Sequence, residues 1–146
     1  MRAYLDCCSL QRPFDDRRQP RIAVEAEAVL VILALCVSRH LQLTSWKALL
    51  FEIGRIPDRT RTNDALAILR LAKEVLELTP EIEAFARQLE AMGMKPLDAL
   101  HLAFASITRA DYFCTCDDQL LRKAKALDGL STTVVSPTEL VMELDK

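Results

Sequence analysis

Four acidic residues occupy positions from which their carboxylates could bind a metal ion. Asp6 ends the first apolar run, "RAYLD", and Asp117 follows another, "YFCTC". Asp98 lies near the start of the apolar segment "KPLDALHLAFASI", and Glu52 lies within "SWKALLFEIGRI". Clustered carboxylates repel one another, and a divalent cation lets them stay ionised together. Hard oxygen ligands suit Mg²⁺ or Mn²⁺, so the chemistry indicated is binding of a phosphate oxygen and activation of water.

Each of these acids also has an ordinary structural explanation. Asp6 could start a turn, since nothing after it is typical of a helix that it could cap, and Asp117 could be an N-cap. Asp98 could be a first-turn acid favoured by the helix dipole, and Glu52, at the edge of its apolar stripe, could pair with Arg55. A metal site is favoured only if the strands before Asp6 and Asp117 are neighbours, because the two acids then face one crevice.

Short strands alternate with helices along the chain. The predicted strands are residues 2–6, 41–45, 75–78, 111–116 and 131–136. The predicted helices are residues 21–40, 46–56, 61–74, 79–93, 95–109 and 117–127, and Thr44 or Ser45 is the expected cap of the second. This alternation predicts a parallel sheet covered on both faces. With no repeat or linker, residues 1–146 are expected to form one α/β domain.

Composition sets limits on the function. Hydrophobic residues make up 51% of the chain and charged residues 27%, as expected for one compact domain, and the net charge of −2 provides no general basic field. A nucleic-acid partner would therefore need local arginines and a bridging metal. The segment 28–37, "AVLVILALCV", is too short to cross a bilayer and is predicted to be a buried helix. Five cysteines without a signal peptide favour reduced thiols in the cytoplasm.

The stretches that contain the acids resemble the motifs of one nuclease family. They are "YLDCCSL", "SWKALLFEIGRI", "PLDALHLA" and "FCTCDDQLL". In this order, and over nearly the whole chain, they are similar to the four acidic motifs of PIN-domain ribonucleases, a group that includes VapC-like toxins. The pairing of "LDALHLA" with Thr-x-Asp-x-x-Leu at Thr115 to Leu120 is the more specific part.

The resemblance implies a fold, an activity and partners. The fold is a three-layer α/β/α domain with a short parallel sheet, often homodimeric, and the activity is Mg²⁺- or Mn²⁺-dependent cleavage of single-stranded RNA. Asp6, Asp98 and Asp117 would hold the principal cation, Glu52 would complete the site and help to orient water, and Thr115 would lie beside it. A toxin would have an antitoxin protein as its partner. The alternative is a non-catalytic PIN-fold module that binds RNA or protein, which the intact set of acids disfavours.

Two departures from the family pattern concern the segment after Asp6. Cys8 stands where many members have Asn or Ser, which puts in question a hydrogen bond beside the site. The loop that follows is longer than expected and carries Arg12, Arg17, Arg18 and Arg21. These arginines could contact phosphates of a substrate, and Arg12 is the one expected to bind it. Equally, the loop could be a solvated linker in which Asp15 and Asp16 offset half of the charge.

Other residues near the motifs have simpler explanations. His101, one turn after Asp98, could bond to that acid or to a substrate, although a core histidine is the better interpretation. Asp118 could replace Asp117 as a ligand, but the Thr-x-Asp spacing favours Asp117. Cysteines 7, 8, 114 and 116 are expected to be buried thiols, because their spacing does not match a zinc site. The helix through 28–37 is apolar on more than one face, which predicts a homodimer unless the helix is buried within one domain.

Overall fold

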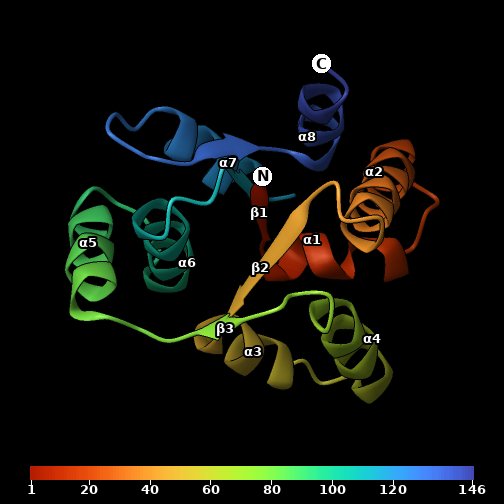
Figure 1. Ribbon diagram of the computed structural model, residues 1–146, viewed down its shortest axis with the longest axis horizontal. Coiled ribbons are helices and arrows are strands. Elements are labelled where there is room, and N and C mark those ends of the chain that lie inside the picture. Colours follow the sequence, from red (N-terminus) through yellow and green to blue (C-terminus); the bar gives the residue numbers. More distant parts are fainter.

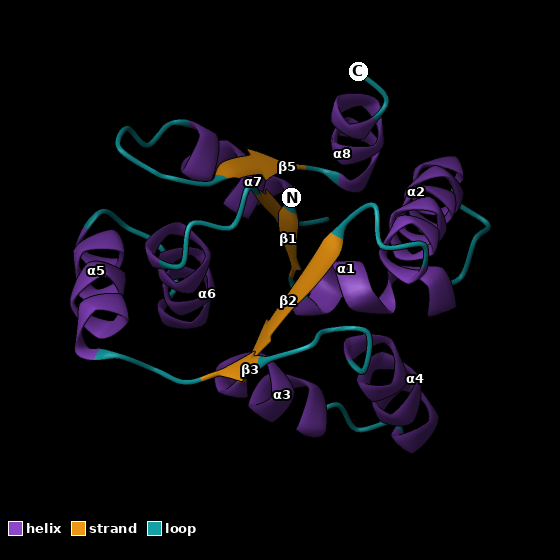
Figure 2. Cartoon of the chain, viewed as in Figure 1, coloured by secondary structure: helices purple, strands orange, loops and turns teal.

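The computed structural model describes all 146 residues, and a five-stranded sheet lies at its centre (Figures 1 and 2). The strands are β1 (Arg2–Leu5), β2 (Gln42–Trp46), β3 (Val75–Leu76), β4 (Tyr112–Cys114) and β5 (Thr133–Val135). Their order is β3-β2-β1-β4-β5, and all four pairings are parallel. The first and fourth strands are neighbours, so the condition on which the metal-site interpretation depends is met.

Helices cover both faces of the sheet. They are α1 (Cys7–Gln11), α2 (Pro20–Val37), α3 (Lys47–Gly54), α4 (Arg59–Leu69), α5 (Pro80–Ala91), α6 (Pro96–Ile107), α7 (Asp118–Lys125) and α8 (Pro137–Leu144), with a 3₁₀ turn, η1, at Arg12–Phe14. Helices α5 and α6 pack together on one side, and α2 and α8 pack together on the other (Figure 1). The result is the expected three-layer α/β/α arrangement.

The sheet and helix α6 share an aromatic core. Trp46 stacks on Phe104 with ring centroids 4.3 Å apart, and Tyr4 stacks on Phe113 at 5.3 Å. All four rings are fully buried. Such large side chains remove much apolar surface from water, and stacked pairs add a further contribution. This core fixes β1, β2, β4 and α6 relative to one another, and the functional residues lie at the end of these elements.

Two expectations about helix starts are wrong. The chain after Asp6 does form a helix, α1, and the Asp6 side chain is its N-cap, accepting the backbone N–H of Ser9 at 3.0 Å. Thr44 and Ser45 do not cap α3, because both belong to β2 and the helix begins only after Trp46, which makes no capping hydrogen bond. Sheet pairing of residues 42–44 with β1 holds Thr44 extended and so prevents the earlier start.

Helix α2 is only partly covered. It buries Val29 and Ile32 against the domain, whereas Val24, Val31 and Val37 are 57%, 45% and 66% exposed. The prediction of a buried helix at residues 28–37 is therefore correct for the inner face alone, and burial within one domain does not account for the outer face. No helix in the structure has the length and apolar character needed to cross a membrane.

Candidate active site

The four predicted acids line one cavity at the carboxyl end of the sheet. Strands β1 and β4 pair with Leu5 beside Cys114, so the residues that follow both strands emerge at the same edge. The cavity measures about 270 Å³. Its walls are formed by Asp6, Cys7, Cys8, Gln11, Glu52, Asp98, His101, Phe113, Asp117 and Leu120. Segments more than 100 residues apart in sequence thus meet at one site.

Asp6 and Asp117 each cap a helix and face the cavity. The Oδ1 atom of Asp6 accepts the backbone N–H of Ser9, and Oδ1 of Asp117 accepts those of Gln119 and Leu120 at 2.9 and 3.2 Å. In both residues the hydrogen bonds are made by Oδ1. The capping and metal-site explanations therefore do not exclude each other, because one oxygen can cap while the other faces the cavity.

Burial and like charge make this cavity costly for anions. Burial raises the pKa of Asp6, although hydrogen bonds from Thr115, Cys8 and Ser9 oppose the effect. Burial also raises the pKa of Asp98, and the negative charges of Asp117 and Asp6 raise it further. Burial and mutual repulsion therefore disfavour several ionised carboxylates in this cavity. A bound cation would relieve that cost.

Glu52 enters the cavity from α3 and faces His101. Its Oε1 atom lies 3.2 Å from Nε2 of His101, and its side chain is 28% exposed. The pairing with Arg55 that the sequence allowed is absent, because the Arg55 guanidinium lies over the Phe51 ring, 5.6 Å from its centre. His101 is buried, as expected for a core histidine, but its ring also forms part of the cavity wall.

The donor set fits a hard divalent cation. All four acids supply carboxylate oxygens, which Mg²⁺ and Mn²⁺ prefer. No three of the chain's histidine, cysteine, aspartate and glutamate side chains are close enough together to enclose one ion directly. Mg²⁺ usually keeps several of its water ligands and binds through only one or two carboxylates, so a site of this width suits it.

The side chains of Thr115 and Cys8 form hydrogen bonds with Asp117 and Asp6 beside the cavity. The Thr115 hydroxyl accepts the backbone N–H of Asp117 at 3.0 Å and also hydrogen-bonds to Asp6. The Cys8 thiol donates to Oδ1 of Asp6 across 3.1 Å, so cysteine supplies the hydrogen bond that the departure from Asn or Ser put in question. All five cysteines are free thiols.

Helix α1 brings into the cavity residues that sequence reasoning missed. Gln11 lines the wall one turn after Cys7 and accepts a hydrogen bond from the Arg61 guanidinium at 3.1 Å. The available signal was Asp6 itself, since aspartate is a favoured N-cap and could have marked "CCSLQ" as a helical turn.

The arginine-rich segment is held by acids of the same chain. Arg12 pairs with Asp15 at 3.0 Å and with the buried Glu25 at 3.3 Å, and it does not line the cavity. Arg21 binds Asp118 through both terminal nitrogens. Asp118 therefore points to Arg21 at the surface, whereas Asp117 lines the cavity. Part of the predicted loop is in fact ordered as α1 and η1.

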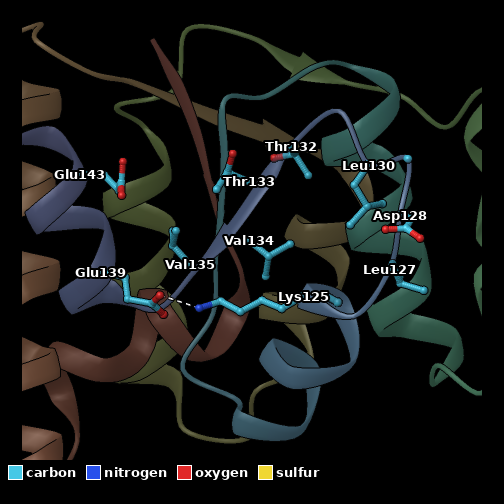
Figure 3. Close-up of a pocket in the computed structure, with 12 residues that line it drawn as sticks. Lys125, Leu127, Asp128, Leu130, Thr132, Thr133, Val134, Val135, Glu139 and Glu143 are labelled. Atoms are coloured by element: carbon cyan, nitrogen blue, oxygen red, sulfur yellow. Dashed lines mark hydrogen bonds and ion pairs between the residues drawn. The ribbon is translucent and has the colours of Figure 1, made fainter.

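A second, larger cavity of about 530 Å³ lies between α7, β5 and α8 (Figure 3). Its acids do not converge as those of the first cavity do. Glu139 forms an ion pair with Lys125 and accepts the backbone N–H of Ser136, and Asp128 and Glu143 stand apart from it in Figure 3. The acidic cavity is therefore the better candidate for catalysis.

Comparison with known proteins identifies the family and the fold of this chain. A family model of the PIN domain matches residues 3–126. The fold is similar to that of PAE2754 from Pyrobaculum aerophilum, with a TM-score of 0.58, 17% identity, and coverage of 99% of this chain and 90% of that one. It is also similar to VapBC2 from Rickettsia felis, solved with a DNA fragment from its promoter. That match has a TM-score of 0.57 and 12% identity, and it covers 93% of this chain and 98% of that one.

No curated protein matches the sequence. The two structures share little sequence with this chain and establish its fold, whereas the family model covers most of the sequence. The matched region includes all four acids of the cavity and the Thr115–Leu120 motif. The chain therefore belongs to the PIN-domain family.

Proposed function

We propose that this protein is a metal-dependent endoribonuclease that hydrolyses phosphodiester bonds of single-stranded RNA. The observation that carries the proposal is the convergence of Asp6, Glu52, Asp98 and Asp117 on one cavity in a PIN-domain chain. A cluster of carboxylates repels the polyanionic backbone of RNA unless a cation lies between them. The site is thus suited to a metal-bridged substrate.

In this proposal the four acids have different roles. Asp6, Asp98 and Asp117 would hold Mg²⁺ or Mn²⁺, in part through water ligands of the ion, and Glu52 would complete the site and help to orient the attacking water. The cation, when bound, would polarise a phosphate oxygen and lower the pKa of water. Thr115 would keep Asp6 and Asp117 in place through its hydrogen bonds.

Arg12 remains a candidate for phosphate contact under this proposal. Its guanidinium is already shared between Asp15 and Glu25, so contact with RNA would require Arg12 to exchange at least one of these partners. Free thiols are typical of a reducing compartment, which favours the cytoplasm as the place of action.

We also propose two protein partners. One is a second copy of the chain, because the outer face of α2 leaves Val24, Leu30, Val31 and Val37 exposed, and exposed apolar surface of this kind is typical of an interface. The other is an antitoxin, since the similar Rickettsia felis protein was solved as a VapBC complex on promoter DNA.

The test is cleavage of labelled single-stranded RNA with Mn²⁺ or Mg²⁺ and with EDTA. The wild type should cleave only with the metal, and Asp6→Asn, Asp98→Asn and Asp117→Asn should each abolish cleavage. Asp118→Asn is the matched control, because this neighbouring carboxylate points to Arg21 and lies outside the cavity. It should keep the wild-type rate.

Two outcomes would overturn the nuclease proposal. One is full activity in EDTA, and the other is full activity in all three cavity variants. If the protein binds RNA or an antitoxin but never cleaves, the non-catalytic PIN-fold module is the correct alternative.

A further inference from the structure

His101 connects the aromatic core to the acidic cavity. It lies on α6, is 3% exposed, and its ring centre is 5.8 Å from that of Tyr4 on β1 and 6.0 Å from that of Trp46 on β2. Its Nδ1 atom faces these two side chains. Its Nε2 atom faces Glu52 and the cavity.

The neighbours of Nδ1 determine which ring nitrogen carries the hydrogen. The Trp46 indole can only donate, and its N–H is directed at the Tyr4 hydroxyl oxygen at 3.0 Å and at Nδ1 of His101 at 3.3 Å. Because the Tyr4 oxygen accepts from Trp46, its own hydrogen is free to point to Nδ1, with which it is hydrogen-bonded.

Both groups that meet Nδ1 therefore present hydrogens to it. Nδ1 must act as an acceptor, and the ring hydrogen must be on Nε2. A nitrogen that carries a hydrogen has no lone pair to offer, so Nε2 of His101 can be neither a metal ligand nor a proton acceptor in this arrangement. It can only donate a hydrogen bond into the cavity.

That donor has no hydrogen-bond partner at present. Nε2 is fully buried and unpaired, and Oε1 of Glu52 lies 3.2 Å away but out of line. Glu52, like Asp98, has a carboxylate that accepts no hydrogen bond. Asp6 and Asp117 are held by backbone N–H groups, whereas the longer, partly exposed Glu52 side chain has no hydrogen bond from the backbone. The Nε2 and Oε1 atoms are already within hydrogen-bond distance, so the pair needs a change of angle and not of position.

We infer that His101, fixed as the Nε2–H tautomer by Tyr4 and Trp46, is a positioning residue that holds the Glu52 carboxylate in the active site. This assignment deepens the proposed function and depends on it only for the activity measurement below. The hydrogen-bond relay from Trp46 through Tyr4 and His101 links the sheet core to the one acid that α3 contributes.

Nuclear magnetic resonance tests the assignment without any cleavage assay. The chain has only His40 and His101, so ¹⁵N-histidine labelling gives two ring systems, and His40→Gln assigns them. His101 should show a protonated Nε2 and an unprotonated Nδ1. Glu52→Gln should shift its Nε2 signals, because a charged acceptor is replaced by a neutral one, and the control Asp118→Asn should not. A protonated Nδ1 with bare Nε2, or signals indifferent to Glu52→Gln, would overturn the inference.

A matched pair of substitutions provides the activity measurement. Gln can place an amide N–H near the Nε2 position, whereas the shorter Asn reaches only the Nδ1 position. His101→Asn should reduce cleavage about 10- to 100-fold, as is usual for partners of active-site ligands, and His101→Gln should recover most of it. Combined with Glu52→Gln, His101→Asn should add little further loss. Equal losses of cleavage activity in His101→Asn and His101→Gln would indicate that the histidine is merely structural. Losses that multiply in the double variant would indicate the same.

The two measurements separate the two proposals. If the wild type cleaves no RNA, the proposed function fails, and the resonance experiment still decides whether His101 binds Glu52. If the wild type cleaves but His101 has the opposite tautomer, only the positioning role fails. Circular dichroism of both His101 variants checks that each is folded.

Discussion

Replacing Asp6 by Asn should stabilise the metal-free protein. Asn keeps an oxygen that can accept the Ser9 N–H, and it caps helices about as well as Asp. What the substitution removes is a buried negative charge that lies close to Asp98. Because the pKa of Asp6 is raised in the folded state, its ionised form is more favourable in the unfolded chain than in the native one. A neutral isostere therefore favours folding.

The gain is expected to be about 1 kcal/mol, the usual size for relief of one unfavourable feature at a functional site. For a chain of this length it corresponds to a rise of about 3 °C in Tm. The gain should be complete above the raised pKa of Asp6, should shrink as the pH falls through it, and should vanish below the ordinary aspartate value of 3.8, where the wild-type carboxyl is protonated in both states. Asp118→Asn should give no rise, because its charge is exposed and paired with Arg21.

Metal should reverse the order of stability. At about 100 times its dissociation constant, a ligand that binds only the native state adds about 2.7 kcal/mol, or roughly 6–10 °C of Tm for a domain this size. Mn²⁺ should give such a shift in wild type and much less in Asp6→Asn. The assay is a set of thermal melts of the three proteins in EDTA and in Mn²⁺. A lower Tm for metal-free Asp6→Asn, together with equal Mn²⁺ shifts in both proteins, would refute the argument from clustered carboxylates.

Three further predictions concern other parts of the molecule. Phe104→Ala should cost about 3–5 kcal/mol in a urea denaturation curve, because it leaves a cavity against Trp46 in the fully buried core; a loss below 1 kcal/mol would contradict that packing. Val31→Lys should convert a dimer to a monomer in light scattering, and a wild type that is monomeric at micromolar concentration would exclude the α2 interface. Ser136→Ala should lower stability by about 1 kcal/mol in thermal melts, since Ser136 and Glu139 form the capping box of α8.

The fold class and the four acids that line the cavity could both be predicted from the sequence. Strands and helices differ in hydrophobic period, and this local signal placed all five strands to within about three residues. Asp6 and Asp117 were recognised because they directly follow buried strands, and parallel strands bring their carboxyl ends to one edge. Asp98 and Glu52 were identified by their places in apolar helices and by the resemblance of their motifs. All of this depends on neighbours in the chain.

The sequence was least informative where local preferences compete with pairing. Thr44 and Ser45 are good capping residues, but Thr44 pairs with Tyr4 in the sheet and the strand continues through Trp46. The sequence offered a turn, and not a helix cap, as the structural alternative for Asp6, because α1 is only five residues long and shows no helical period. A single turn of helix carries too little pattern to be distinguished from a loop.

Contacts between distant side chains could not be predicted from the sequence. The order β2-β1-β4 brings Asp6 beside Asp117, and no local pattern specifies strand order. Glu52 faces His101, which is 49 positions away in the sequence, and not the nearby Arg55. The arginines that could have contacted RNA are instead paired with acids of the same chain, Arg12 with Glu25 and Arg21 with Asp118. The hydrophobic period of a helix or strand depends on residues close together in the sequence. The partners of a charged group or of a ring nitrogen depend on segments that come into contact only when the chain is folded.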